Sequence, residues 1–368
     1  MQYTVCMKIK SAFIFLFLGI LSACKSSDVR SDSILEYRGA DISYFYRQEQ
    51  SGVQFYSNGK EAELFDILKE AGVNWIRLRL WHTPSDGWNN LEKTISVAQR
   101  AKASGFKLLL DIHYSDSWAD PSSQSLPAEW ETYSFDRLNE AVSSYTESVL
   151  SAFSPADCIP DMVQTGNEIS NGMLWPYGKI KEGGDCSDFM ALLGTAVTAV
   201  RNFSPYVKIM LHIPCDKDIQ RVVWWYSQAE KYSIDYDVIG LSYYSFFTGT
   251  DFSIVSDTVQ NLKKQFDKEI CIAETSYPWT LDWNDNENNL VGLEEQLILG
   301  FPASREGQQR YLNELCRRLF LLRPFRLLLK TLHGLTLTMN ILELNSRVLF
   351  DFIIFNGEIF FIIPVFFL

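Results

Sequence analysis

Two glutamates in this chain stand where they could together break a glycosidic bond. Glu168 follows the apolar segment 161–166, and Glu274 closes the apolar segment 269–274. Two carboxyl groups across a cleft can share the hydrolysis of a glycoside, because one protonates the leaving oxygen while the other attacks the sugar or activates water. A single glutamate at a strand end is more often a salt-bridged residue. The prediction therefore requires that these two glutamates meet.

Other side chains suited to binding a sugar lie at the ends of similar segments. The amide of Asn167 can donate to a sugar hydroxyl, and His212 can bond a catalytic carboxylate or cap its own strand. Trp118 and Trp279 can stack on a sugar ring or pack against neighbouring residues. The candidate substrate-binding residues are Asp41, Arg77, Arg79, His113, Asp116, Trp118, Asn167, His212, Tyr243 and Trp279.

Arg77 and Arg79 are two residues apart, so they point to the same face of an extended segment. A buried arginine is costly unless it is paired. We expect the pair to hold Glu274, Asp41 or substrate, with one of the two in a structural ion pair. Arg77 or Tyr243 could stabilise the ionised form of Glu274.

The elements that must position these residues alternate along the chain. Short apolar segments predict strands over 38–43, 74–81, 106–113, 161–166, 207–212, 237–243 and 269–274. Helical patterns cover 61–71, 91–104, 138–153, 190–203 and 257–266, and glycines follow the first two. This alternation fits an eight-stranded (β/α)8 barrel or a doubly wound open sheet. The barrel is favoured, because polar residues end nearly every strand and no glycine-rich phosphate loop follows the first.

The start of the chain is typical of an export signal. Lys8 and Lys10 precede an apolar run over 12–21, and Leu21–Cys24 resembles a bacterial lipobox, in which the cysteine is lipidated. An ordinary secretory signal is the alternative. We expect a signal peptide over 1–24, lipidation at Cys24 and a tether over 25–36. The product would be exported and anchored to the membrane by lipid, in the periplasm or on the cell surface.

The end of the chain has a different composition. Residues 316–368 contain neither Trp nor Tyr, although both are frequent before them, and the apolar run over 352–368 contains Glu358 and Pro364. A charged group is costly inside a bilayer, so a membrane anchor is the weaker interpretation. The sequence indicates a catalytic domain over 37–315 followed by an aberrant hydrophobic tail over 316–368, of the kind that a frameshift produces.

Charge limits the partners that the chain can bind. The formal net charge of −12 opposes binding to nucleic acid, whose phosphates would be repelled. Aromatic residues make up 14% of the chain, which suits either a large aromatic core or the stacking of flat, weakly charged ligands such as sugars. We expect a monomer with a polysaccharide substrate, no metal and no other cofactor.

The motifs resemble those of glycoside hydrolase family 53, the endo-β-1,4-galactanases, within the clan of retaining barrel glycosidases. The matching stretches are Arg38–Ser43, Asn74–Trp81, Asp111–Pro121, Thr165–Ile169, Leu174–Pro176, Gly240–Tyr244 and Ala273–Trp279. The resemblance implies that Glu168 is the acid/base and Glu274 the nucleophile. It further implies cleavage, with retention of configuration, of the β-1,4-galactan side chains of pectic arabinogalactan.

The chain departs from the family at its eighth strand. The family ends with a Tyr-Trp-Glu-Pro-Ala-Trp-like strand, and this chain has no Trp beyond position 283. Some relatives bind calcium near that strand, but no such ligands are identifiable here. A barrel without this strand has two open edges, so we expect a product that folds poorly or is weakly active. The alternatives are a non-catalytic glycan-binding lipoprotein, a clan glycosidase acting on mannan or cellulose, and an inert product.

Overall fold

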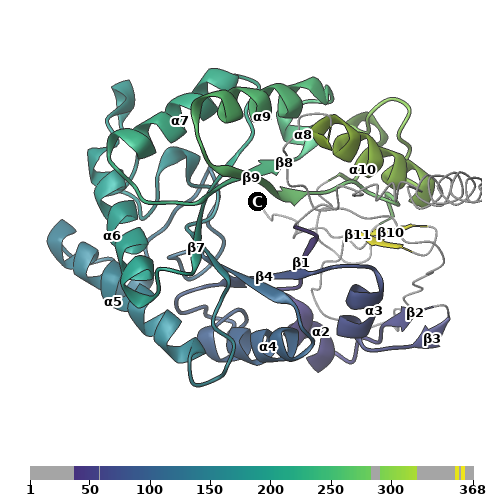
Figure 1. The fold of residues 1–368 in the computed structure, drawn as a ribbon, viewed down its shortest axis with the longest axis horizontal. Helices are drawn as coiled ribbons and strands as arrows, with labels where there is room; N and C mark the ends of the chain where they lie inside the picture. The colour runs from purple at the N-terminus through teal and green to yellow at the C-terminus, as the bar shows by residue number, and fades with distance from the viewer. Residues whose placement is uncertain (1–36, 58, 283–290, 321–352, 356–357, 361–368) are drawn as a thin grey trace, which may run out of the picture. The chain divides into compact units, whose positions relative to one another are not determined.

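The computed structural model describes residues 37–57, 59–282, 291–320, 353–355 and 358–360. Seven parallel strands form one curled sheet in the order β1-β4-β5-β6-β7-β8-β9, and helices line its outer side (Figure 1). The strands are β1 (Gly39–Asp41), β4 (Trp75–Leu80), β5 (Lys107–Ile112), β6 (Met162–Thr165), β7 (Lys208–Pro214), β8 (Val238–Tyr243) and β9 (Glu269–Thr275). All seven predicted strands are confirmed, and so is the barrel architecture.

Both faces of the sheet are buried, which explains the continuous apolar runs in the sequence. Alternate residues point inward, where they form a compact layer that closes the interior near the amino-terminal strand ends. Its members are Tyr37, Trp75, Leu109, Met162, Met210, Val238 and Cys271. The intervening residues, such as Ile76 and Leu78, pack outward against the helices. Polar side chains therefore enter the interior only above this layer, towards the carboxyl ends of the strands.

The helices between the strands follow the predicted pattern with small shifts at their ends. Asn90 and Ser134 cap two of them, each accepting a hydrogen bond from a backbone N–H in the first turn. The sequence analysis did not predict α7, which occupies 219–231. The helices are α2 (Phe45–Gln50), α3 (Leu64–Glu70), α4 (Leu91–Ala103), α5 (Phe135–Phe153), α6 (Ser187–Phe203), α7 (Ile219–Lys231), α8 (Ser245–Thr248), α9 (Ser253–Gln265) and α10 (Arg305–Phe320).

Within the described residues no eighth strand joins β9 to β1, as predicted from the missing motif. The described part of the tail pairs with itself, since β10 (Ile353–Phe355) and β11 (Glu358–Phe360) form a separate antiparallel hairpin. A second small hairpin joins β2 (Tyr56–Ser57) to β3 (Lys60–Glu61). Helix α10 continues to Phe320, past the composition change at 316.

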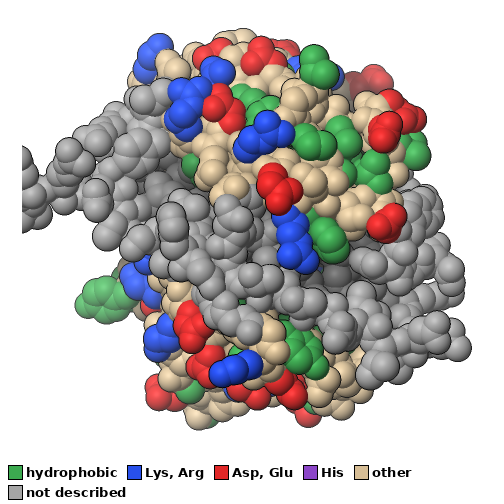
Figure 2. Space-filling model, turned by 90° about the vertical axis from the view of Figure 1, so that its right-hand side faces the viewer, with side chains coloured by type: hydrophobic (Ala, Val, Ile, Leu, Met, Phe, Trp, Pro, Cys, Tyr) green, Lys and Arg blue, Asp and Glu red, His purple; other side chains and the backbone are tan. Residues whose placement is uncertain are grey.

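The described surface carries charges of both signs. On the side shown in Figure 2, basic and acidic side chains are interspersed with hydrophobic ones. No helix in the described part of the chain is both long enough and apolar enough to span a membrane.

A tight turn after Glu168 provides a test of the packing around the site. Gly172 has a φ of 92°, and a Cβ at this position would lie 1.9 Å from the Gly178 carbonyl oxygen. Gly183 has a φ of 82°, but a Cβ there would meet no atom within 4 Å. Both alanine variants incur the cost of a positive φ. Gly172→Ala adds a clash with backbone and a backbone conformation, with ψ near −169°, that is open essentially to glycine alone.

We therefore expect Gly172→Ala to lower the free energy of unfolding by about 1–3 kcal/mol more than Gly183→Ala does. Urea unfolding followed by circular dichroism measures the difference. Equal losses in the two variants would contradict the tight packing of this turn.

Candidate active site

The two glutamates meet at the carboxyl ends of their strands, as predicted. Glu168 lies just beyond β6 and Glu274 lies in β9. Both are almost completely buried, and an oxygen of each carboxyl group lies within 4.8 Å of the other. This separation is close to the roughly 5–5.5 Å of retaining glycosidases and shorter than the roughly 6.5–9.5 Å of inverting ones. The backbone of Glu168 is left-handed, with a φ of 47°, which turns its side chain out of the strand direction.

A buried arginine links the site to three strands. The Arg77 guanidinium forms ion pairs with Asp41 at 2.9 Å, Asp111 at 2.8 Å and Glu274 at 2.9 Å. Its Nη2 also donates to Asn167 Oδ1 at 2.9 Å. These contacts confirm the predicted role of Arg77 and place Asp41 in the same network. Burial would lower the pKa of Arg77, but the three carboxylates raise it, so the side chain stays charged.

The environment of Glu168 favours its protonated form. Burial and the negative charge of Glu274 raise the pKa of Glu168 well above its ordinary value. Glu274 instead has an Arg77 ion pair and accepts a hydrogen bond from the Tyr244 hydroxyl at 3.0 Å. Burial raises the pKa of Tyr244, which keeps it a donor. The two carboxyl groups thus have different surroundings, as an acid and a nucleophile require.

His212 is hydrogen-bonded to the backbone of Glu168 and, through Ser242, to the Glu274 carboxylate. Its Nδ1 accepts from the Glu168 backbone N–H at 3.3 Å and lies 3.1 Å from Asn167 Oδ1. Because a backbone N–H can only donate, Nδ1 is the acceptor, and Nε2–H donates to Ser242 Oγ at 2.8 Å. The Ser242 hydroxyl then donates to Glu274 Oε2 at 3.3 Å. Burial lowers the pKa of His212 well below its ordinary value, so the ring is neutral and reaches Glu274 through Ser242.

Two residues predicted to contact the substrate, Asn167 and His113, are buried and hydrogen-bonded within the protein. Asn167 is buried, and its amide donates to the Ala119 carbonyl oxygen at 2.9 Å rather than being presented to the cleft. His113 is also buried, with Nε2 donating to Asp111 and Nδ1 accepting from the Ala119 N–H. Burial lowers the pKa of His113, whereas Arg77 and His113 together lower that of Asp111 to about 2 despite its burial. These contacts help to position the catalytic groups, and contact of Asn167 and His113 with substrate stays a prediction.

Asp116 connects two loops rather than lining a groove. Its carboxylate accepts from the backbone N–H groups of Thr83 and Ala128, both at 2.8 Å. One oxygen also lies 3.5 Å from His82 Nδ1. The prediction that Asp116 contacts substrate is not supported by these contacts, because both oxygens already hold backbone groups.

Arg79 differs from Arg77 in having no carboxylate partner. It is 1% exposed, and none of its guanidinium nitrogens has a hydrogen-bond partner among the described residues. The guanidinium carbon lies 3.8 Å from the ring centre of Trp118 and 4.8 Å from those of Trp81 and Tyr44. Contact of Arg79 with Glu274 or Asp41 is not seen, because aromatic faces surround the cation, and its contact with substrate stays a prediction. The half-buried Trp118 keeps its candidate role at the rim.

Tyr243 was the wrong member of the Tyr243–Tyr244 pair. Successive residues of a strand point to opposite faces, so Ser242 and Tyr244 face Glu274 while Tyr243 faces away. The Tyr243 hydroxyl donates to the Gly249 carbonyl oxygen at 3.3 Å, and the residue is fully buried. Alternation from the inward residue Ser242 would have identified Tyr244 in advance.

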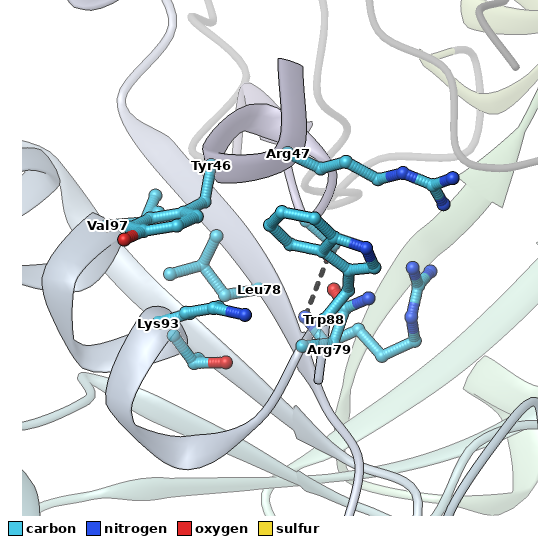
Figure 3. A pocket seen from close by; sticks show the side chains of 10 residues that line it. Tyr46, Arg47, Leu78, Arg79, Trp88, Lys93 and Val97 are labelled. Atoms are coloured by element: carbon cyan, nitrogen blue, oxygen red, sulfur yellow. Dashed lines mark hydrogen bonds between the residues drawn. The ribbon is translucent and has the colours of Figure 1, made fainter. Parts of the chain in front are cut away.

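The remaining predicted residues lie apart from this network. Trp279 follows β9 and is 36% exposed, with the Arg305 guanidinium 5.7 Å from its ring centre. Cys24 lies outside the described residues. Figure 3 shows a cavity beside β4 in which Trp88 stands between Tyr46 and the Arg47 head group. Its volume of about 10 Å³ is too small for a sugar.

The side chains at the site already have partners that a metal ion would have to displace. Among the described residues, Glu168, His212 and Glu274 are the group whose ligand atoms lie close enough to share one. Both ring nitrogens of His212 already take part in hydrogen bonds, and the Arg77 cation lies 2.9 Å from Glu274.

A barrel with two buried carboxyl groups this close together at its carboxyl-terminal strand ends defines a glycoside hydrolase. Comparison with known families agrees, because the glycosyl hydrolase family 53 model matches residues 37–321. The chain belongs to this family.

Its relatives include characterised and solved members. It is 34% identical to the arabinogalactan endo-β-1,4-galactanase of Cellvibrio japonicus, over 80% of this chain and 79% of that protein. The catalytic domain of an Ignisphaera aggregans family 53 protein superposes with a TM-score of 0.74 at 36% identity, over 79% of this chain and 82% of the other. A fungal β-1,4-galactanase structure gives 0.70 at 32% identity, with coverage of 80% and 89%.

The contrast between the two arginines is testable. Arg77→Met leaves three buried carboxylates without their cation and should cost about 3–5 kcal/mol of unfolding free energy. Arg79→Met removes a buried cation that has no carboxylate partner, and the lost contact with aromatic rings offsets the regained desolvation energy. We expect the free energy of unfolding of this variant to lie within about 1 kcal/mol of that of the parent, or above it. Urea unfolding of both variants measures this, and a large loss from Arg79→Met would show that Arg79 has an essential partner.

The raised pKa of Glu168 makes stability depend on pH. Above the ordinary glutamate pKa of about 4.3, the unfolded chain loses this proton while the folded protein keeps it, so folding weakens as pH rises. This loss continues up to the folded-state pKa. Glu168→Gln abolishes the titration, so the variant should melt at a higher temperature than the parent near pH 7. The two should melt alike near pH 4, and a constant difference at every pH would contradict the assignment.

Proposed function

We propose that the chain is a retaining endo-β-1,4-galactanase that cleaves the galactan side chains of pectic arabinogalactan. The observation that carries the retaining mechanism is the short separation of the Glu168 and Glu274 carboxyl groups. The substrate is supported by relatives described as arabinogalactan endo-β-1,4-galactanases, which align with more than three quarters of this chain.

The proposed reaction has two displacements. In the first, Glu168 gives its proton to the glycosidic oxygen while a Glu274 oxygen attacks the anomeric carbon, so the leaving sugar departs as an alcohol. Glu168, now ionised, removes a proton from water in the second step, and the resulting hydroxyl displaces Glu274. Tyr244 and Arg77 hold the Glu274 carboxylate in position for attack.

We also propose the export of this enzyme as a lipoprotein. The lipobox-like run before Cys24 supports lipidation at that residue, and the basic and apolar residues before it support secretion. The anchored enzyme would act as a monomer on polymeric galactan outside the cytoplasm. Incorporation of labelled fatty acid, lost in Cys24→Ser, is the corresponding measurement.

One observation favours a second candidate function. The described sheet has open edges at β1 and β9. A barrel with such a gap can bind a glycan without hydrolysing it. Under that alternative the chain binds galactan and releases no sugar.

The roles of the two glutamates can be separated with variants of the full chain. Glu274→Ala should reduce turnover of galactan by roughly a thousandfold or more, and added azide should restore part of it with inverted configuration. Glu168→Ala should lose about 10²–10⁴-fold on galactan but keep the first step on aryl galactosides, whose leaving groups need no proton.

Glu147→Ala, on the exposed face of α5, is the matched control and should act like the parent. Equal losses on all substrates in the Glu168 variant would contradict its role as acid. Binding of galactan without turnover in the parent would favour the second candidate function.

A further inference from the structure

A pair of exposed phenylalanines lies next to the catalytic site. Phe246 and Phe247 belong to α8, the short helix that directly follows β8 at the carboxyl end of the sheet (Figure 1). They are 41% and 57% exposed, although single exposed aromatic residues are otherwise scattered over the described surface. Both rings are therefore accessible to a ligand at the carboxyl end of the sheet.

The pair is in contact with the groups that hold the nucleophile. The Phe247 ring centre lies 6.4 Å from that of Tyr244, in an edge-on arrangement, and 5.1 Å from that of Phe246. Tyr244 in turn donates to Glu274 at 3.0 Å. A continuous aromatic path therefore runs from the nucleophile to the exposed rings.

The chemistry of the pair selects its ligand. Phenylalanine has no hydrogen-bonding atom, so for an uncharged ligand its ring favours apolar C–H surface. A galactose ring offers such a surface, because its axial 4-oxygen leaves the C–H bonds at positions 3, 4 and 5 on one face. Ligand sites combine apolar and aromatic walls with a few fixed polar groups, and here the polar groups are those around Glu274 and Glu168.

We propose that Phe246 and Phe247 form a stacking surface for a galactosyl unit of the polymer that extends beyond the sugar undergoing cleavage. This inference rests on the proposed function and goes beyond it, because it assigns a binding site to residues outside the catalytic network. Because the two rings continue from Tyr244 at the catalytic site, we assign the surface to the polysaccharide chain that is cleaved there and not to a separate protein partner.

The test uses the full chain with Phe246→Ala, Phe247→Ala, the double variant and Phe247→Tyr. Tyr206→Ala is the matched control, since Tyr206 is 92% exposed and precedes β7 at the opposite end of the strands. The readouts are KM and kcat on β-1,4-galactan, melting temperature, and retardation of each protein in gels that contain galactan.

We expect each alanine variant to raise KM on galactan about three- to tenfold, with kcat and melting temperature close to those of the parent. Retardation in galactan gels should weaken in parallel. Phe247→Tyr should restore most of the loss, because it retains the ring, and Tyr206→Ala should change nothing.

The experiment distinguishes failure of the stacking surface from failure of the proposed galactan substrate. Unchanged KM and retardation in the double variant, with a parent that cleaves or binds galactan, would overturn the stacking surface alone. A parent that acts on mannan or cellulose instead of galactan would overturn the proposed substrate, and the same variants would then be measured on that polymer. There, an effect specific to the two phenylalanines would assign them to a different sugar and overturn their assignment to galactose. A parent that binds and cleaves none of these polymers would overturn both proposals.

Discussion

The buried Arg77 cation is the interaction on which the site depends. It contacts Asp41 beside β4, Asp111 on β5 and Glu274 on β9, and thereby joins residues that are distant in sequence. Arg77 without these carboxylates would be a costly buried charge, and each carboxylate would be costly without Arg77. The curled sheet brings these four charged groups together, so Glu274 acquires its ion pair only when the sheet folds. Asn167, held by the same guanidinium, extends this control to the acid side of the site.

The chemical difference between the two glutamates follows from their surroundings. Glu274 has a cation and two hydroxyl donors, Tyr244 and Ser242, whereas Glu168 is buried beside the like charge of Glu274. Burial alone would penalise both charges equally. The asymmetric placement of Arg77 decides which carboxyl group keeps its proton, as acid and nucleophile chemistry in one cleft requires.

The sequence predicted the seven strands, because each is a short, mostly apolar run that is buried on both faces and ends near a polar group. It could not show which residues touch, since contacts such as Arg77 with Asn167 depend on sheet register. Tyr243 was chosen over Tyr244 because alternation was not counted from a fixed inward residue. The sequence also could not show that Arg79, expected to hold Glu274, Asp41 or substrate, lies against the rings of Tyr44, Trp81 and Trp118.

The central claim is that Glu168 and Glu274 form a retaining pair in a sheet that lacks an eighth strand within the described residues. The most direct test is the anomeric configuration of the sugar first released from β-1,4-galactan, followed by proton NMR before mutarotation. Two displacements predict that the β-anomer appears first and the α-anomer grows in later. Initial release of the α-anomer would contradict the account, because it would require a single displacement by water between two more widely separated carboxyl groups.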